Sequence, residues 1–466
     1  MKGFPFFKRL LPALVLLGLS DFDDVSPDAE IVLDFTAALD AATVEANIYL
    51  LDAGGAKVDA SDVYDGAKRV TLKPSAGLNA YASYRLIVDS GLKSAAGEAI
   101  LTGKVIRIRT GLDTSDKFPQ ISDEELLTKV QQQTFRYFWE GAEPTSGMAR
   151  ERTSSGATVT TGGTGFGVMA MTVAAERGFV TRSEACQRVQ RIVTFLAERA
   201  TSYHGAFSHW IDGQTGQTLP FSADDNGADL VETGLLFQGL LTARAYFDGA
   251  DAAESKLRAD ITALWEAVEW DFFTKEGTEK VLYWHWSPDK GWAMNMPIQG
   301  WNEALIVYVL AASSPTHPIG REVYAEGWAR GGAMRNGKLF YDTVLPLGED
   351  YGGPLFWAQY SFLGLNPRGL SDAYADYWEQ VCNHTRINYA YCVDNPKGYA
   401  GYGADCWGLT ASDIPDGYTA SSPTNDRGVI APTAALSSMP YTPDESMAAL
   451  RFFYYKLGDK LWSDYG

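Results

Sequence analysis

The chain has 466 residues and a net charge of −19 at neutral pH, from 58 acidic and 39 basic residues. A surface of this sign repels phosphate backbones, so we do not expect a nucleic-acid partner. Hydrophobic residues make up 46% of the chain, which excludes extensive disorder, and the length suggests two or three domains. Aromatic residues reach 13%. Most such rings are core residues, but they also suit sites that bind the flat C–H faces of sugars.

Residues 1–20 look like a signal segment. Lys2, Lys8 and Arg9 precede an apolar run at residues 10–19, which is too short to span a bilayer. We therefore expect a periplasmic or secreted protein with no membrane span. Ser20 stands where a bacterial lipoprotein would carry a cysteine, so lipid anchoring is not expected.

The four cysteines are Cys186, Cys382, Cys392 and Cys406, and none of them forms a C-x-x-C pair. They do not cluster with the five histidines, so we expect no metal site and no cofactor. A disulfide between Cys392 and Cys406 and free buried thiols are equal alternatives at this point.

Residues 26–111 are predicted to form a small all-β domain. Turn signals such as Gly54-Gly55 and Asp65-Gly66 separate short strand-like runs, which read IVLDFT, NIYLLD, RVTLKP, YRLIVD and VIRIRT. This spacing fits an antiparallel sandwich. The passages FTAALD and TLKPSAGLNAYASYRLIV resemble bacterial Ig-like domains, a resemblance that implies a structural spacer.

From residue 120 to residue 466 the pattern is mainly α. Ser122 followed by Glu125 is a capping box. The predicted helices cover residues 122–141, 164–178, 182–200, 228–247, 251–272, 302–313, 319–330, 354–363, 371–389, 430–438 and 443–462. Their number is what an (α/α)6 toroid, a double ring of six helix pairs, requires. An irregular helical bundle is the alternative.

Three acidic residues, Asp225, Asp229 and Glu232, occur in the segment DDNGADLVETGLLFQGLL. At positions i, i+4 and i+7 they would share one face of a helix, within about 60° of one another. Buried carboxylates are costly unless they face water or a polar ligand, so this pattern predicts the floor of a binding cleft. Capping of the helix N-terminus is the alternative, and it explains Glu232 least well.

Glu303 is the second candidate, in the segment PIQGWNEALIVYVLAASSPTHPI. We expect Asn302 to be the N-cap and Glu303 the first helical residue. The helix dipole would lower the pKa of Glu303, whereas desolvation beside Trp301 would raise it. The sequence leaves the direction open.

The third candidate is an aromatic loop, YAYCVDNPKGYAGYGADCWGLTASDIPDGY, which has no helical or strand periodicity. It contains Asp405, Asp413 and Asp416, and long irregular loops inside a compact domain are often functional. Asp416, in the PDG triplet, is also a typical turn residue.

Other side chains are candidate sugar contacts, with core packing as the alternative for the aromatic ones. They are Arg152, Trp284, His285, Trp286, Phe356, Tyr360 and Trp407. The glycine-rich TGGTGFGVMA lacks the spacing and the lysine of a phosphate-binding loop. It predicts a helix entry with close backbone packing.

Residues 120–464 resemble glycoside hydrolase family 144, the bacterial glucoamylase-like domain. The resemblance is carried by TGFGVMAMTVAAERGFVTR, DDNGADLVETGLLFQGLL, LYWHWSP, WNEALIVYVLAASSPTHPI, GPLFWAQYSFLGLNPR and CWGLTASDIPDGY. It implies an (α/α)6 toroid and endo-acting, anomer-inverting hydrolysis of β-1,2-glucan to short sophoro-oligosaccharides. Gln359 departs from a histidine found in many relatives, which leaves subsite detail open.

By the same resemblance, Glu303 is the best candidate for the general acid. Asp225, Asp229 and Glu232 fall on acidic positions of the family's cleft, and Asp413 lies in its most distinctive loop. An inverting enzyme needs a protonated carboxyl and a base that holds water, typically about 6.5–9.5 Å apart. The base is not identified by the sequence.

Two alternatives remain open. The chain could be an exo-acting or other-linkage glucosidase on the same fold, or a non-catalytic glycan-binding protein. In each case the expected partner is a β-glucan polysaccharide or oligosaccharide, and the expected state is a monomer.

Overall fold

The computed structural model describes residues 14–17 and 21–466, and the chain divides into two compact units, Met1–Ser115 and Asp116–Gly466. The signal-like segment 1–20 lies outside the described residues except for residues 14–17. Of these, Leu14 and Leu16 are buried and form isolated β-bridges with Ile100 and Phe35. None of the described helices combines the length and the apolar character needed to cross a membrane.

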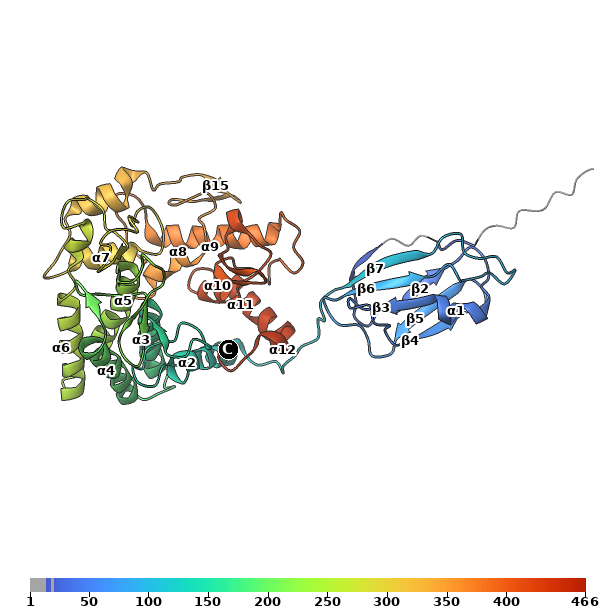
Figure 1. The fold of residues 1–466 in the computed structure, drawn as a ribbon, viewed down its shortest axis with the longest axis horizontal. Helices are drawn as coiled ribbons and strands as arrows, with labels where there is room; N and C mark the ends of the chain where they lie inside the picture. The colour runs from blue at the N-terminus through green and yellow to red at the C-terminus, as the bar shows by residue number, and fades with distance from the viewer. Residues whose placement is uncertain (1–13, 18–20) are drawn as a thin grey trace, which may run out of the picture. The chain divides into compact units, whose positions relative to one another are not determined.

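The N-terminal unit consists of two sheets (Figure 1). Its elements are β1 (Phe22–Val25), β2 (Ile31–Asp34), α1 (Ala41–Asn47), β3 (Ile48–Leu51), β4 (Ala60–Tyr64), β5 (Arg69–Pro74), β6 (Ser83–Val88) and β7 (Lys104–Thr110). One sheet has the order β1-β7-β6-β3 and the other β2-β5-β4. Alternate residues of both sheets, such as Leu33, Leu72 and Leu86, enter one core, as the alternating pattern of the sequence predicts.

The sequence did not predict β1, β4 or the helix α1. In β4 no side chain is fully buried, so the strand has no strong hydrophobic alternation to reveal it. Among the named strands of this unit the pairing is antiparallel except that β1 runs parallel to β7, which corrects the expectation of an antiparallel sandwich at this strand.

The second unit is mainly helical (Figure 1). Its helices are α2 (Asp123–Trp139), α3 (Thr161–Glu176), α4 (Arg182–Glu198), α5 (Leu230–Tyr246), α6 (Ala252–Glu266), α7 (Leu305–Ser313), α8 (Phe356–Gln359), α9 (Tyr377–Asp394), α10 (Pro432–Ser437), α11 (Pro443–Arg451) and α12 (Gly458–Leu461). The capping box at the start of α2 is confirmed, because Ser122 and Glu125 bond reciprocally. The predicted helix at 319–330 is a π-helix at Val323–Trp328.

Short strands lie between these helices. They are β8 (Thr158–Thr160), β9 (Ser202–Tyr203), β10 (Ala206–Phe207), β11 (Trp210–Asp212), β12 (Thr218–Leu219), β13 (Ala228–Asp229), β14 (His285–Trp286), β15 (Leu339–Phe340), β16 (Thr343–Val344), β17 (Ala411–Ile414) and β18 (Gly417–Ala420). The pair β17–β18 is a hairpin inside the aromatic loop, which corrects the expectation of an irregular loop.

The C-terminal helices return to α2, so that the helical unit closes on itself (Figure 1). Leu126 of α2 belongs to the same core cluster as Leu450 of α11. The Arg451 guanidinium pairs with the Asp123 carboxylate across the same junction. This closure agrees with a ring of helices, while the arrangement in six pairs stays a prediction.

Glycines allow α3 and α5 to pack at backbone contact. A Cβ atom at Gly165 would lie 2.2 Å from the carbonyl oxygen of Leu235, and one at Gly239 would lie 2.1 Å from the carbonyl oxygen of Gly165. The predicted close packing of the glycine-rich helix entry is therefore confirmed. It brings the start of α3 against residues 235–239 of α5.

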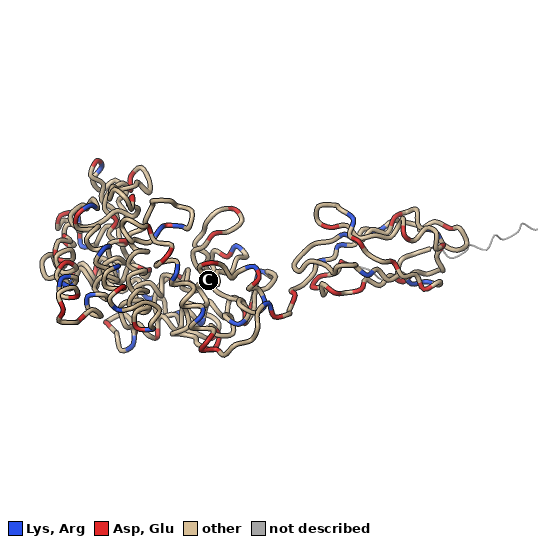
Figure 2. Tube along the Cα trace, turned by 90° about the horizontal axis from the view of Figure 1, so that it is seen from below, with Lys and Arg blue, Asp and Glu red and all other residues tan. Residues whose placement is uncertain are grey.

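The four cysteines are free, so the alternative of thiols rather than a Cys392–Cys406 disulfide is the one observed. Both residues belong to the core cluster beneath the aromatic loop. Lys and Arg are interspersed with Asp and Glu along the described trace of both units (Figure 2).

Candidate active site

Two of the predicted acids lie before helix α5, not on it. Asp229 is the N-cap, and its Oδ1 accepts hydrogen bonds from the backbone N–H groups of Val231 and Glu232 at 3.0 and 2.9 Å. Asp225 lies in the preceding loop. The expectation of three acids on one helix face is wrong, because an aspartate that caps the backbone N–H groups starts the helix after itself. The capping alternative is correct for Asp229.

The pairing of β13 with β14 adds His285 to the acids. The register sets Asp229 opposite His285. The Nε2 atom of His285 lies 3.4 Å from Oδ2 of Asp225 and 3.7 Å from Oδ2 of Asp229. Its Nδ1 atom has no hydrogen-bond partner among the described residues. Burial lowers the pKa of His285, so this imidazole is neutral at neutral pH.

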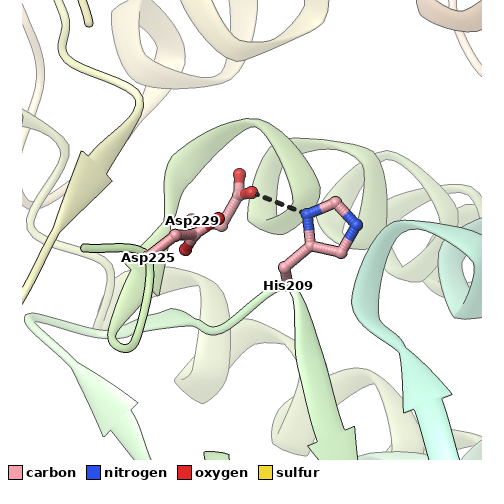
Figure 3. Close-up of side chains that lie close together, drawn as sticks. All are labelled: His209, Asp225 and Asp229. Atoms are coloured by element: carbon pink, nitrogen blue, oxygen red, sulfur yellow. Dashed lines mark hydrogen bonds and ion pairs between the residues drawn. The ribbon is translucent and has the colours of Figure 1, made fainter. Parts of the chain in front are cut away.

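A second histidine, His209, points toward Asp229 (Figure 3). Its Nδ1 atom lies 3.1 Å from Oδ2 of Asp229, and its Nε2 atom lies 4.0 Å from Oε1 of Glu232. Burial disfavours the imidazolium. The hydrogen bond to Asp229 and the nearby carboxylates outweigh burial and raise the pKa of His209 to about 9. His209 is therefore protonated at neutral pH and can donate from Nδ1 to Asp229.

One imidazole and two carboxylates at this place could also offer ligand atoms to a divalent cation. Atoms of His209, Asp225 and Asp229 all lie within 4.8 Å of one another (Figure 3). The Nδ1 atom of His209 is already bonded to Asp229. The sequence-based expectation that no metal is involved stays a prediction.

Glu232 is held by the start of α3. Its Oε2 atom accepts hydrogen bonds from the backbone N–H of Gly162 at 2.7 Å and from the Thr160 hydroxyl at 3.3 Å. A Cβ atom at position 162 would lie 2.6 Å from that oxygen, so the approach requires glycine. Burial nevertheless raises the pKa of Glu232, against the effect of the His209 charge.

Glu303 lies in the turn just before α7, which begins at Leu305. The Ser361 hydroxyl donates to the carbonyl oxygen of Glu303 at 2.7 Å and accepts from the N–H of Ile306 at 3.1 Å, which fixes this turn. The expectation of Asn302 as N-cap is wrong, because the Asn302 side chain bonds the N–H of Ala304 within the turn. Glu303 thus lies outside the helix.

Burial raises the pKa of Glu303 to about 7, and the charges of Glu232 and Asp229 add to the rise. The sequence left the direction of the Glu303 pKa shift open, and desolvation decides it upward. Burial and the charge of Asp229 likewise raise the pKa of Asp225 to about 7. The cluster therefore holds carboxyl groups that exchange protons near neutral pH, as acid–base catalysis requires.

Arg152 and Asp413 meet beside the β17–β18 hairpin. Nη1 of Arg152 lies 2.7 Å from Oδ2 of Asp413. The hairpin register sets Tyr418 opposite Asp413. Burial raises the pKa of Tyr418, and the charges of Arg152, Asp413 and Glu303 also act on its hydroxyl. Tyr418 therefore lies near the candidate acid, and sequence reasoning missed it.

Three of the predicted aromatic side chains lie near these acids or pack on their neighbours. The pKa of Tyr360 is raised by burial and further by the charges of Glu232 and Glu303, which therefore lie near its hydroxyl. Phe356 packs on Tyr360 with ring centroids 5.2 Å apart. The indole of Trp284 stacks on His285 at 5.8 Å.

The remaining two predicted tryptophans pack away from the carboxylates. Trp407 is fully buried and donates from Nε1 to the carbonyl oxygen of Glu445, so it is a core residue and the prediction of a sugar contact is wrong. Trp286 packs against His204 and Phe272.

Gln359, which departs from the family pattern, is buried. Its side-chain amide donates to the Ser438 hydroxyl, and its carbonyl oxygen accepts from the Ser437 hydroxyl. The amide therefore links α8 to α10.

His209 is the functional residue that sequence reasoning missed most clearly. One signal was present, because a His-Trp pair occurs at residues 209–210 and again at 285–286. Both histidines of these pairs lie within 4 Å of one carboxylate oxygen, Oδ2 of Asp229.

Comparisons with known proteins identify the family of each part of the chain. The family model Glycoamylase, described as "Putative glucoamylase", matches residues 295–466, and a bacterial Ig-like domain model matches residues 20–107. A glucoamylase-like crystal structure from Bacteroides uniformis is 56% identical, covers 75% of this chain and 85% of its own, and has a TM-score of 0.73.

Two further relatives carry named activities. The endo-β-1,2-glucanase structure from Chitinophaga pinensis is 50% identical, covers 74% of this chain and 86% of its own, and has a TM-score of 0.72. The exo β-1,2-glucooligosaccharide sophorohydrolase of Parabacteroides distasonis is 47% identical over 367 residues, which are 74% of this chain and 51% of the relative. The chain thus spans about half the length of that curated relative.

Proposed function

Since this chain belongs to the bacterial glucoamylase-like family of glycoside hydrolases, we propose that its acidic cluster hydrolyses β-1,2-glucan. The observation that carries the proposal is Glu303, a carboxyl group whose pKa is raised to about 7 by burial and by the charges of Glu232 and Asp229. A carboxyl that keeps its proton near neutral pH can protonate the oxygen of the leaving sugar.

We assign the general acid to Glu303 and the base to Glu232. Asp229 is fully buried and already accepts bonds from two N–H groups and from His209, so it offers little access for an attacking water molecule. Glu232 is 16% exposed, and its bonds to Gly162 and Thr160 occupy only Oε2. Its Oε1 atom can therefore hold a water molecule.

The proposed stereochemistry is inversion, and the proposed mode of action is endo. In an inverting reaction Glu232 takes a proton from the water that attacks the anomeric carbon, while Glu303 gives its proton to the departing oxygen as the glycosidic bond breaks. Exo action remains the second candidate, because relatives of both modes match this chain. The anomer released first, followed by proton NMR, tests inversion.

The finer architecture belongs to the same proposal. We propose an (α/α)6 toroid at residues 120–466 behind an Ig-like spacer at residues 26–111. We also propose a monomer that acts in the periplasm or outside the cell, since the family model of the N-terminal part is a bacterial Ig-like domain.

Incubation of the purified chain with β-1,2-, β-1,3-, mixed-linkage and α-1,4-glucans tests the proposal. Chromatography is expected to reveal short β-1,2 oligosaccharides of mixed length at early times. Release of sophorose alone would favour exo action. Cleavage of another glucan alone, or of none, would contradict the proposed substrate.

A further inference from the structure

An exposed aromatic ring, Phe221, lies beside the acidic cluster and has no part in the chemistry proposed above. Its side chain belongs to the exposed large hydrophobic residues, at 51% exposure. Its ring centroid lies 4.5 Å from that of His209 and 4.8 Å from that of Trp210. Since His209 bonds Asp229, Phe221 is one side chain away from the buried carboxylates.

The loop that carries Phe221 is fixed. The N–H of Phe221 donates to the carbonyl oxygen of Asp225 at 2.9 Å, which ties the backbone at Phe221 to the backbone of one of the acids of the cluster. Nζ of Lys290 bonds the carbonyl oxygen of Ala223 and Oδ1 of Asp224, both at 2.6 Å. The exposed ring is therefore held in place before any ligand arrives, which lowers the entropic cost of binding.

We propose that Phe221, backed by Trp210, is a sugar-stacking subsite that holds one glucosyl unit of the β-1,2-glucan chain next to the acidic cluster. A pyranose ring offers an apolar C–H face to an aromatic ring and hydroxyl groups at its edge. Phe221 offers no hydrogen bond and binds the face, while His209 and the neighbouring carboxylates lie within reach of the edge. The occupant is thus a neutral sugar and not a charged ligand.

This inference rests on the proposed function, and its test separates the two. We compare wild type with Phe221→Ala, Phe221→Leu and Phe221→Trp, and with Leu339→Ala as a control at another exposed apolar residue. Initial rates on β-1,2-glucan give kcat and KM, and calorimetry gives the Kd for the same glucan. Unfolding temperatures check that each variant is folded.

The Ala and Leu variants are expected to raise KM and Kd about tenfold with kcat within about twofold, because the ring binds substrate and transition state alike. The Trp variant keeps an aromatic face and is expected to stay near wild type, as is the Leu339 control. Values of KM and Kd within about twofold of wild type for Phe221→Leu would overturn the subsite.

Absence of turnover by wild type would contradict the proposed hydrolysis but not the subsite. In that event the Kd values decide. Binding that is weakened by Phe221→Leu supports the stacking role, and binding that is unchanged or absent overturns it.

Discussion

His209 and Asp229 form a hydrogen-bonded pair in the buried part of the site. Asp229 is fully buried, so loss of the imidazolium leaves a carboxylate without its cationic partner. We expect His209→Ala to lower the free energy of unfolding at pH 7 by about 3 kcal/mol. Urea denaturation measures the loss.

His317 offers a matched control. It lies at the same 3.1 Å from Asp271, but the two side chains are 38% and 56% exposed. His317→Ala is expected to cost less than about 0.5 kcal/mol. Equal losses for the two variants would contradict the assigned role of burial.

The pH dependence of the His209 pair follows from its raised pKa. The stability that it contributes is fully present below the unfolded value of 6.5 and is lost as pH rises through about 9. The difference between wild type and His209→Ala should therefore shrink above pH 9.

Glu303 is expected to destabilise the fold at alkaline pH. Its pKa rises from 4.5 to about 7 on folding, so the folded state holds a proton that the unfolded state has lost between these values. Stability falls as pH rises through this window. Glu303→Gln removes the effect, and its free energy of unfolding should exceed that of wild type by about 2 kcal/mol at pH 8.

The gain in free energy of unfolding of Glu303→Gln should vanish at pH 4, where Glu303 of the wild type is protonated in both the folded and the unfolded state. A thermal unfolding series from pH 4 to pH 8 measures both limits. A gain of the same size at every pH would show that the carboxyl is not strained by burial.

At the scale of residues, the sequence predicted which acids lie close together but not the geometry in which they do so. Asp225, Asp229 and Glu232 do lie together, although only Glu232 is in the helix. Helix periodicity therefore predicted the correct group of acids, although the placement of all three on one helix face was wrong. His209 was missed, because the repeated His-Trp pair does not reveal its contact with Asp229, which depends on tertiary packing.

At the scale of elements, the contact of α3 with α5 both packs the two helices together and positions Glu232. A Cβ at Gly165 would meet backbone atoms of Leu235 at 2.2 Å, whereas one at Gly162 would meet the flexible end of Glu232 at 2.6 Å. We expect Gly165→Ala to cost about 3 kcal/mol of stability. Gly162→Ala should instead lower kcat about 10²-fold by displacing Glu232.

Gly403→Ala is the control for both, since no atom lies within 4 Å of its added Cβ. Its stability should change by less than about 0.5 kcal/mol. Stability curves and kcat for the three variants separate the role in helix packing from the role in positioning Glu232. A larger kcat loss in Gly165→Ala than in Gly162→Ala, at equal folded fraction, would contradict the positioning role of Gly162.

Elements with strong hydrophobic patterns were predictable, and those without were not. The long helices α2 to α6 lie close to their predicted ranges, whereas the weakly buried β4 and the β17–β18 hairpin were missed. Exposed hairpins bury little, so their sequence carries little periodicity.

At the scale of the whole molecule, the two units have separate cores. One hydrophobic cluster lies within the N-terminal unit and the others within the helical unit, as do all the acids of the site. A chain of residues 116–466 is therefore expected to keep kcat/KM on β-1,2-glucan within about twofold of full length. A loss beyond tenfold would assign the Ig-like unit a part in catalysis.

The measurement that tests the central claim most directly is kcat of Glu303→Gln on β-1,2-glucan. The glutamine keeps the shape of the side chain but has no proton to donate. With folding confirmed by an unfolding temperature at or above that of wild type, kcat is expected to fall by about 10³-fold, the contribution of a general acid. A variant that retains kcat within about tenfold of wild type would contradict the assignment of the acid to Glu303.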